Sequence, residues 1–356
     1  MPIRLFVVDD SAVMRQGISH LLHGDREVVL AGTAPNPIVA APMIRRLEPD
    51  VLLLDVEMPG MDGLTFLRQQ MAEAPIPTIV CSTLTVAGGP IALEALSAGA
   101  VSVVTKPRMD LQAYIESSRR ELISAIRAAA AARPCRSTAA SGAAVAAVAA
   151  GPQPRSGVRG AGRTLAVGKP VLIGGSTGGV QAVEAILSRL PADAPGIAIV
   201  QHMPAGFTRM WAERMDGIVP MAVREATDGA RLDRGVALIA PGGHHLELRK
   251  VGGDYHAVVK PGPPVNRHTP SVDVLFRSAA TCAGSDAQGI LLTGMGDDGA
   301  RGMKALFDAG ARTIAQDEAT CIVFGMPKEA IALGAVEEVL PIDRIADAIL
   351  RFDARG

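Results

Sequence analysis

The stretch Val171–Val180, V-L-I-G-G-S-T-G-G-V, decides the fold that we predict for the second half of this 356-residue chain. Three apolar residues suited to a buried strand lead into four glycines, with Ser176 at the centre of the cluster and helix-forming residues beyond it. A strand that turns sharply into a helix needs small residues on both sides of the bend. We therefore predict a strand–turn–helix unit that holds the Ser176 hydroxyl at the carboxyl end of a sheet, beside free backbone N–H groups.

Three interpretations of this turn are open. The spacing Gly174-x-Ser176-x-Gly178 fits the G-x-S-x-G pattern of serine nucleophiles, and a purely structural turn fits equally well. Glycine-rich turns before a helix also bind phosphate, although this stretch lacks both the Gly-Lys-Ser/Thr ending of a P-loop and a G-x-G-x-x-G motif. A serine nucleophile needs a base, so the remaining sequence has to supply one.

Composition narrows the class of protein. The length is sufficient for two domains, and 48% hydrophobic with 20% charged residues is typical of a globular α/β protein. A net charge of -1 argues against a nucleic-acid or membrane-surface binder. An acidic pair soon after the amino terminus argues against a signal peptide, and no apolar run has the length of a membrane span. The four cysteines form no C-x-x-C pair, which indicates reduced thiols in a cytoplasmic protein.

The first third of the chain alternates short apolar runs with helical patterns. Such alternation predicts a doubly wound parallel sheet with helices on both faces. The five predicted strands are Ile3–Val8, Val28–Ala31, Val51–Leu54, Ile76–Cys81 and Val101–Thr105.

The middle of the chain has a different composition. Residues 128–165 are rich in Ala, Gly, Pro and Arg, and no acidic residue occurs from Leu122 to Val183. Such a segment offers little large apolar surface to offset its ordering entropy, so we predict a flexible linker. The predicted domains are then residues 1–127 and 166–356.

The second domain also alternates strands with helices, and hairpin-like runs interrupt it between Val236 and Lys260. This pattern predicts an α/β domain with a mostly parallel sheet and an antiparallel hairpin. The predicted strands are Val171–Ile173, Ile197–Gln201, Met221–Arg224, Val236–Ala240, Leu246–Arg249, His256–Lys260, Ile290–Thr293 and Thr313–Ala315. The predicted helices are Val180–Leu190, Phe207–Met215, Val272–Ala283, Ala300–Ala309, Lys328–Leu333 and Ile342–Phe352.

Acidic residues follow two strands of the first domain. Asp9 and Asp10 follow the first strand, Asp55 follows the third, and Ser82 and Lys106 follow the fourth and fifth. Carboxyl ends of parallel strands converge at one edge, where gathered carboxylates repel one another unless a cation such as Mg²⁺ is present. A single strand-end Asp often only caps a helix, but this whole set at such places favours a functional site.

The motifs V-V-D-D-S, L-L-L-D-V-E-M-P-G-M-D-G and T-K-P resemble the receiver domain of two-component response regulators, which has a flavodoxin-like fold. The resemblance implies that Asp55 accepts a phosphoryl group from a histidine kinase. It also implies Mg²⁺ as a cofactor, held by Asp10, Asp55 and the backbone carbonyl of Glu57. Asp9 would assist through a water molecule.

The same resemblance gives roles to two further residues. Lys106 would contact the phosphoryl group, and Ser82 would be the hydroxyl that responds to it. Val103 departs from the family pattern, because many receivers carry an aromatic switch residue there. The departure puts aromatic switching in doubt but not phosphorylation.

Candidates for a base and an acid occur in the second domain. His202, in I-A-I-V-Q-H-M-P, ends the strand that follows the Ser176 helix, and Asp297 and Asp298 follow another strand in I-L-L-T-G-M-G-D-D-G. A histidine base needs an acid that fixes its tautomer, although a lone histidine is often structural and such aspartates often cap helices. The chain order Ser, His, Asp differs from that of α/β-hydrolases, which disfavours the generic hydrolase fold.

The motifs G-G-S-T-G-G, Q-H-M-P, P-P-V-N-R-H-T-P-S-V-D-V-L-F and L-T-G-M-G-D-D-G resemble the methylesterase domain of chemotaxis. Behind a receiver, they make the whole chain similar to the CheB family of protein-glutamate methylesterases/glutamine deamidases. The resemblance implies Ser176 as nucleophile, His202 as base and Asp298, which directly precedes the glycine, as orienting acid. The backbone N–H groups of Thr177 and Met295 would be the oxyanion donors.

The resemblance further implies hydrolysis of glutamate γ-methyl esters on chemoreceptor helices, deamidation of receptor glutamines, and inhibition by the receiver until Asp55 is phosphorylated. We expect a cytoplasmic monomer whose partners are chemoreceptors and a histidine kinase, with no nucleic acid and no membrane insertion. Arg267 and His268 are hypothesised to shape the substrate cleft. The alternative is a response regulator whose second domain only binds a partner or a nucleotide.

Overall fold

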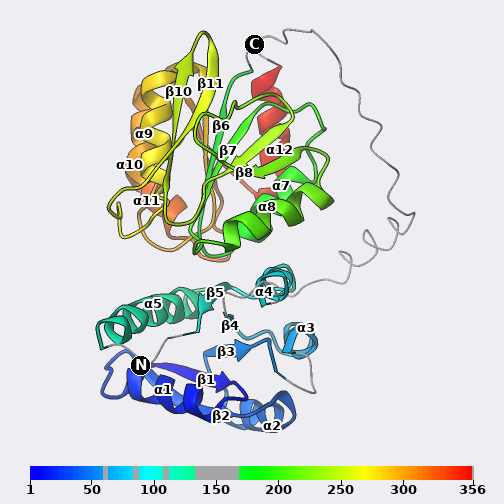
Figure 1. The fold of residues 1–356 in the computed structure, drawn as a ribbon, viewed down its shortest axis with the longest axis vertical. Coiled ribbons are helices and arrows are strands. Elements are labelled where there is room, and N and C mark those ends of the chain that lie inside the picture. Colours follow the sequence, from blue (N-terminus) through cyan, green and yellow to red (C-terminus); the bar gives the residue numbers. More distant parts are fainter. Residues whose placement is uncertain (59–62, 83–87, 107–111, 133–167, 355–356) are drawn as a thin grey trace, which may run out of the picture.

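The computed structural model describes residues 1–58, 63–82, 88–106, 112–132 and 168–354. Two α/β domains lie one above the other (Figure 1). Most of the predicted linker, residues 128–165, lies outside the described residues. Helix α5 continues to Ala130, beyond the expected boundary at Arg127, and buries Ala128 and Ala129.

The N-terminal domain is the predicted five-stranded parallel sheet, and its strands lie in the order β2-β1-β3-β4-β5. Every residue of β3 is buried because helices cover both faces of the sheet. The strands are β1 Ile3–Val8, β2 Val28–Ala34, β3 Val51–Asp55, β4 Thr78–Ser82 and β5 Ser102–Thr105. The helices are α1 Ala12–Leu22, α2 Pro37–Leu47, α3 Gly63–Glu73, α4 Gly88–Ser97 and α5 Gln112–Ala130.

The C-terminal domain contains a seven-stranded sheet in the order β14-β13-β12-β6-β7-β9-β8. All of its pairings are parallel. The strands are β6 Val171–Gly175, β7 Ile197–Gln201, β8 Ala222–Glu225, β9 Val236–Ile239, β12 Gln288–Leu291, β13 Arg312–Gln316 and β14 Glu338–Leu340. The helices are α7 Gly179–Leu187, α8 Phe207–Ile218, α9 Val272–Cys282, η1 Gly284–Asp286, α10 Ala300–Asp308, α11 Met326–Ala332 and α12 Ile342–Asp353.

The predicted hairpin is formed by β10, His245–Val251, and β11, Asp254–Lys260. Its two strands form a separate sheet that packs against α9, so the main sheet remains wholly parallel. The predicted α/β class with an antiparallel hairpin is confirmed. Strand β14 was not predicted, because three residues at a partly exposed edge are too short for a periodic pattern.

Strand β6 lies at the point where the order of the second sheet reverses. Its neighbours are β7, which follows it in the chain, and β12, which returns from a later part of the chain. Helices α7, α8 and α12 cover one face, and α9, α10 and α11 cover the other (Figure 1). Such a reversal opens a crevice beyond the carboxyl ends of the strands, which is where parallel sheets place ligand sites.

Helix α4 of the N-terminal domain packs against α7 and α8 of the C-terminal domain. The Gln181 side-chain amide donates to the carbonyls of Leu96, at 2.5 Å, and Ala100, at 2.9 Å. Arg214 donates to the Ser97 hydroxyl at 2.8 Å. The carboxyl edge of the second sheet therefore faces the first domain.

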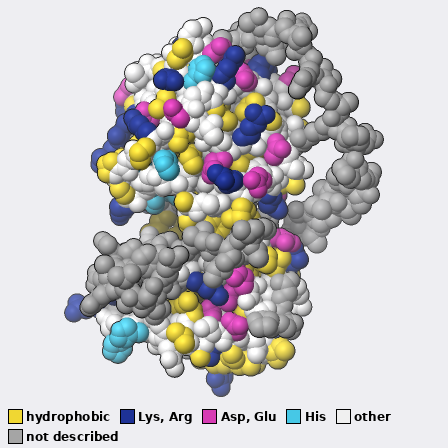
Figure 2. Space-filling model, viewed as in Figure 1, with side chains coloured by type: hydrophobic (Ala, Val, Ile, Leu, Met, Phe, Trp, Pro, Cys, Tyr) yellow, Lys and Arg dark blue, Asp and Glu magenta, His cyan; other side chains and the backbone are white. Residues whose placement is uncertain are grey.

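Charged side chains of both signs are interspersed over the C-terminal domain on the face drawn in Figure 2. This mixture agrees with the net charge of -1. Among the helices of the described ranges, none is both long and apolar enough to span a membrane.

Candidate active site

The turn after β6 is held by its neighbours in the sheet. The Ser176 backbone N–H donates to the Thr293 carbonyl at 3.0 Å, and the Gln201 side-chain amide donates to the Ser176 carbonyl at 2.6 Å. Gly178 has a φ of 82°, a left-handed conformation that favours glycine. The expected strand–turn–helix unit is present, and its serine is partly exposed.

The loop after β12 closely approaches this turn. A Cβ atom on Gly294 would lie only 2.7 Å from the Cβ of Ser176, so glycine is required for the approach. The loop then continues to Asp298, which precedes α10. The Ser176 turn and the aspartate loop thus form one compact edge.

His202 follows β7 and lies beside Asp298. The His202 Nε2 atom is 2.8 Å from Asp298 Oδ2, and the two side chains are only 7% and 1% exposed. The other ring nitrogen, Nδ1, is buried without a hydrogen-bond partner among the described residues. Ser176 and His202 line the same cavity of about 70 Å³. This arrangement leaves Nδ1 as the nitrogen available to a proton from the serine side.

Asp298 receives several hydrogen bonds besides the one from His202. Its Oδ1 accepts from Asn266 Nδ2 at 2.8 Å and from the Ser271 hydroxyl at 2.7 Å, while its Oδ2 accepts from the Val272 N–H at 2.7 Å. Burial favours the neutral acid, but the interaction with His202 and the hydrogen bonds from Asn266 and Ser271 outweigh it, and the pKa of Asp298 lies below its ordinary value. Asp298 is therefore held as a carboxylate.

His268 stacks on His202, with ring centroids 3.7 Å apart and planes inclined by 9°. Burial, together with the neighbouring His202 and Arg267, lowers the pKa of His268 to about 3, against the opposing effect of Asp298. His268 is therefore neutral at pH 7. The Arg267 side chain is 81% exposed and lies 3.7 Å from Asp297, so the other aspartate of the pair forms an exposed ion pair.

Two backbone N–H groups at this edge have no acceptor. Among the described residues, neither the Thr177 nor the Met295 N–H donates a hydrogen bond. Thr177 lines the cavity beside Ser176, and Met295 follows Gly294, which approaches the serine. Free N–H groups beside a nucleophile are what a developing oxyanion requires.

The N-terminal domain forms the second wall of this cavity. Leu96 and the segment 101–103 line it opposite Ser176 and His202. Val103, the position that lacks the aromatic residue of many receivers, belongs to this wall. A volume of about 70 Å³ accommodates little more than water, so the cavity as it stands excludes a protein substrate.

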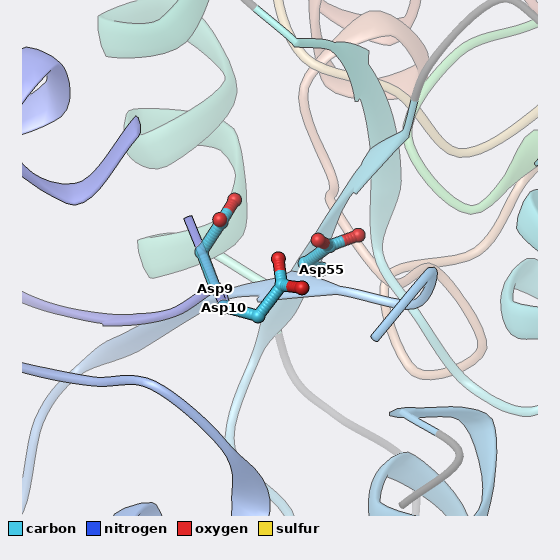
Figure 3. A group of neighbouring side chains, drawn as sticks. All are labelled: Asp9, Asp10 and Asp55. Carbon is cyan, nitrogen blue, oxygen red and sulfur yellow. The ribbon is translucent and has the colours of Figure 1, made fainter. Parts of the chain in front are cut away.

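The carboxylate cluster predicted in the N-terminal domain is present (Figure 3). One carboxylate oxygen from each of Asp9, Asp10 and Asp55 lies within 4.8 Å of the others. Lys106 Nζ lies 2.6 Å from Asp55 Oδ2 and 3.9 Å from Asp9 Oδ2. This arrangement of hard oxygen ligands fits Mg²⁺.

Charge and burial act together in this cluster. Burial, with the charges of Asp55 and Asp10, raises the pKa of Asp9 in spite of Lys106. The pKa of Lys106 is also raised, because its hydrogen bond to Asp55 and the nearby carboxylates outweigh its burial. The Ser82 hydroxyl, at the end of β4, donates to the Glu57 carboxylate at 2.9 Å.

Comparison with known proteins gives the family. The family model for the CheB methylesterase matches residues 171–349, and that for the response regulator receiver domain matches residues 5–116. The chain belongs to the CheB methylesterase family. A relative from Dechloromonas aromatica (strain RCB), named protein-glutamate methylesterase/protein-glutamine glutaminase 2, is 50% identical over 352 residues, or 98% of each chain.

A second relative and a solved structure support the same family. A relative from Anaeromyxobacter dehalogenans (strain 2CP-C), named protein-glutamate methylesterase/protein-glutamine glutaminase 5, is 50% identical over 354 residues, or 99% of this chain and 97% of its own. The crystal structure of the Thermotoga maritima CheB methylesterase catalytic domain is 39% identical and has a TM-score of 0.51. It covers 52% of this chain and 98% of its own.

Sequence reasoning did not find every residue at the site of this CheB family member. Asn266 and Ser271 lie in the motif P-P-V-N-R-H-T-P-S, but nothing in that motif indicates that both contact Asp298. Gln201 belongs to the motif Q-H-M-P, but nothing in that motif indicates that its side chain holds the Ser176 turn. The sequence feature that could have indicated Asn266 is a polar side chain between nearby prolines. In the structure its φ is 49°, a left-handed conformation that Asn tolerates.

Proposed function

We propose that this chain is a phosphorylation-activated protein-glutamate methylesterase that hydrolyses glutamate γ-methyl esters on chemoreceptors to glutamate and methanol. The observation that carries the proposal is that Ser176 and His202 line one cavity and that His202 contacts Asp298, the three residues following adjacent strands. Its family membership supports the same conclusion.

In the proposed reaction, Ser176 attacks the γ-carbonyl carbon while its proton passes to His202 Nδ1. Asp298 accepts the hydrogen bond from Nε2–H, which fixes the tautomer and stabilises the imidazolium that forms. The Thr177 and Met295 N–H groups donate to the oxyanion. Methanol leaves with the proton from His202, and water then releases the glutamate from Ser176 by the reverse transfers.

The same residues are proposed to deamidate specific receptor glutamines. The carbonyl of an amide presents the same oxygen to the two N–H groups, and ammonia leaves with the proton from His202. The acyl-enzyme is identical for both substrates, so the second half of the reaction does not change.

Control is proposed to come from the receiver. With Leu96 and segment 101–103 against the cavity, the unphosphorylated form is closed to a receptor helix. Phosphorylation of Asp55 by a histidine kinase, with Lys106 and Ser82 contacting the phosphoryl group, would favour the open form. Mg²⁺, when bound, would neutralise charge on the transferring phosphoryl group. The proposed ligands are Asp10, Asp55 and the Glu57 carbonyl, with Asp9 assisting through water.

The proposed organisation is a receiver over residues 1–127, a linker over 128–165 and a catalytic domain over 166–356. The proposed partners are the cytoplasmic helices of chemoreceptors as substrate and a histidine kinase as phosphodonor. We propose that the chain acts as a monomer in the cytoplasm.

The test is an assay for methanol from methylated receptor membranes and for ammonia from receptors that retain glutamine. We expect both products, and faster release when acetyl phosphate and Mg²⁺ are added. Labelling of Ser176 by a serine-reactive phosphonate, lost in His202→Ala, would support the nucleophile. A folded chain that binds receptors but neither releases methanol nor reacts with the phosphonate would favour a binding domain instead.

A further inference from the structure

One side-chain amide joins two buried carboxylates beside the active site. Asn266 Nδ2 lies 2.8 Å from Asp298 Oδ1 and 2.9 Å from Asp273 Oδ2. Asp298 and Asp273 are 1% and 0% exposed. We propose that Asn266 is a positioning residue for the proposed esterase reaction, on which this inference rests, and that it aims the Asp298 carboxylate at His202.

The two oxygens of Asp298 have separate tasks. Oδ2 faces the His202 ring and also accepts from the Val272 N–H. Oδ1 accepts from Asn266, from Ser271 and, at 3.3 Å, from the Asp273 N–H. The terminal torsion of an aspartate is broad, so hydrogen bonds rather than the side chain itself set the rotation of the carboxylate. The donors to Oδ1, together with the Val272 N–H, therefore decide where Oδ2 points, and Asn266 and Ser271 are the side chains among them.

An amide is suited to this place because it donates two protons and carries no charge. Two buried carboxylates around one nitrogen atom repel each other, and each needs a donor. An ionised carboxylate in place of the Asn266 amide would be an acceptor only, and it would add a third negative charge. A lysine or arginine would bring a net charge that competes with His202 for Asp298.

The backbone presents the amide in a fixed direction. Asn266 and Arg267 have φ values of 49° and 71°, in the left-handed region that Asn tolerates better than most residues. Val265 and His268 exchange backbone hydrogen bonds of 3.0 and 2.9 Å around them. The amide is therefore preorganised before any substrate binds.

Asp273 anchors the other end of the arrangement. Its Oδ1 accepts from the Gly302 N–H at 2.6 Å, and its Oδ2 also accepts from Arg277, whose side chain is 50% exposed. Arg277 thus shares an acceptor with Asn266 but has no hydrogen bond to Asp298. It offers a matched control for effects that pass through Asp273 alone.

The first experiment compares Asn266→Gly, Asn266→Asp and Arg277→Ala in the full chain with acetyl phosphate and Mg²⁺. Glycine removes the amide but keeps the left-handed backbone available. We expect Asn266→Gly to lower kcat about 10- to 100-fold with KM within about twofold, and Asn266→Asp to lower it further. Arg277→Ala should stay within about twofold of the parent, since every hydrogen bond to Asp298 remains. Thermal unfolding checks that each variant is folded.

The second experiment separates positioning from a general structural role. The rate of Ser176 labelling by a serine-reactive phosphonate is measured for Asn266→Gly, Asp298→Asn and the double variant. If Asn266 acts through Asp298, its substitution slows labelling in the parent but has little further effect beside Asp298→Asn. An equal slowing in both backgrounds, or none in the parent, would overturn the proposal.

The labelling rate also separates this inference from the proposed function. A parent chain that reacts with the phosphonate but releases no methanol would refute the receptor ester as substrate. The role of Asn266 would still be tested, because it is measured by the labelling rates of the variants. A folded parent that does not react at all would overturn both.

Discussion

Both domains gather functional side chains at the carboxyl edge of a parallel sheet, but they hold them differently. In the N-terminal domain, Asp9 and Asp55 come directly from the ends of adjacent strands, and Lys106 balances their charge. In the C-terminal domain, Asp298 lies on a loop beyond β12 and is held by neutral donors such as Asn266. The edge in the N-terminal domain is organised by charge, which suits a cation site. The edge in the C-terminal domain is organised by hydrogen bonds, which suits a proton relay.

The same residue type behaves oppositely at the two edges. Burial and nearby carboxylates raise the pKa of Asp9, whereas the donors around Asp298 lower its pKa although it is also buried. Burial acts in the same direction on both carboxylates, and the donors and charges around each one decide the net direction. Substitutions at each edge and at the contact between the domains test this difference.

The largest expected effect is that of Ser176→Ala. Removing the nucleophile should reduce methanol release by about 10⁴-fold or more, because the other members of the site then have nothing to activate. The control is Ser188→Ala, which changes an exposed serine at the end of α7. Equal thermal stability with unreduced turnover in Ser176→Ala would contradict the proposed nucleophile.

Asp55→Asn tests the carboxylate cluster of the N-terminal domain. We expect it to keep basal esterase activity and to lose stimulation by acetyl phosphate, because no carboxylate remains to accept the phosphoryl group. Asp50→Asn changes an aspartate just before the opposite end of β3 and should remain stimulable. Methanol release with and without acetyl phosphate measures both variants, and persistent stimulation in Asp55→Asn would refute Asp55 as the acceptor.

Gln181→Ala tests the contact between the two domains. Its amide donates to two carbonyls of the receiver, and each hydrogen bond is worth about 0.5–1.5 kcal/mol. Weakening the closed form should raise unstimulated activity about 3- to 10-fold. Gln70→Ala, which removes a hydrogen bond within the receiver, should leave it unchanged. An unaltered basal rate in Gln181→Ala would show that this contact does not hold the site closed.

The last expected effect is on stability and concerns pH. The pKa of His268 is about 3 in the fold and 6.5 ordinarily, so the unfolded chain binds the proton more readily and stability falls as pH drops below about 6.5. His268→Phe removes this group and should lessen the loss between pH 7 and pH 5 by about 2 kcal/mol. Urea unfolding at both pH values measures the difference. An identical loss in the parent and in His268→Phe would contradict the lowered pKa.

Periodicity was enough to predict every strand of the two sheets except β14, but not the order of the strands in the second sheet. That β12 lies beside β6 is decided by packing of helices on both faces, which acts between segments far apart in the chain. His202 and Asp298 are separated by 96 positions yet are in contact. Asn266 escaped prediction for the same reason, since its role depends on two carboxylates that meet only in the fold.

Local units follow from the amino-acid sequence alone: the glycine turn around Ser176, the aspartates at strand ends and the alternation that makes parallel sheets. They arise from backbone sterics and from side-chain period, which act over a few residues. The folded chain was needed to show that His202 contacts Asp298, that Asn266 donates to both Asp298 and Asp273, and that the receiver lines the cavity. Those contacts depend on packing between distant segments, and no local pattern records them.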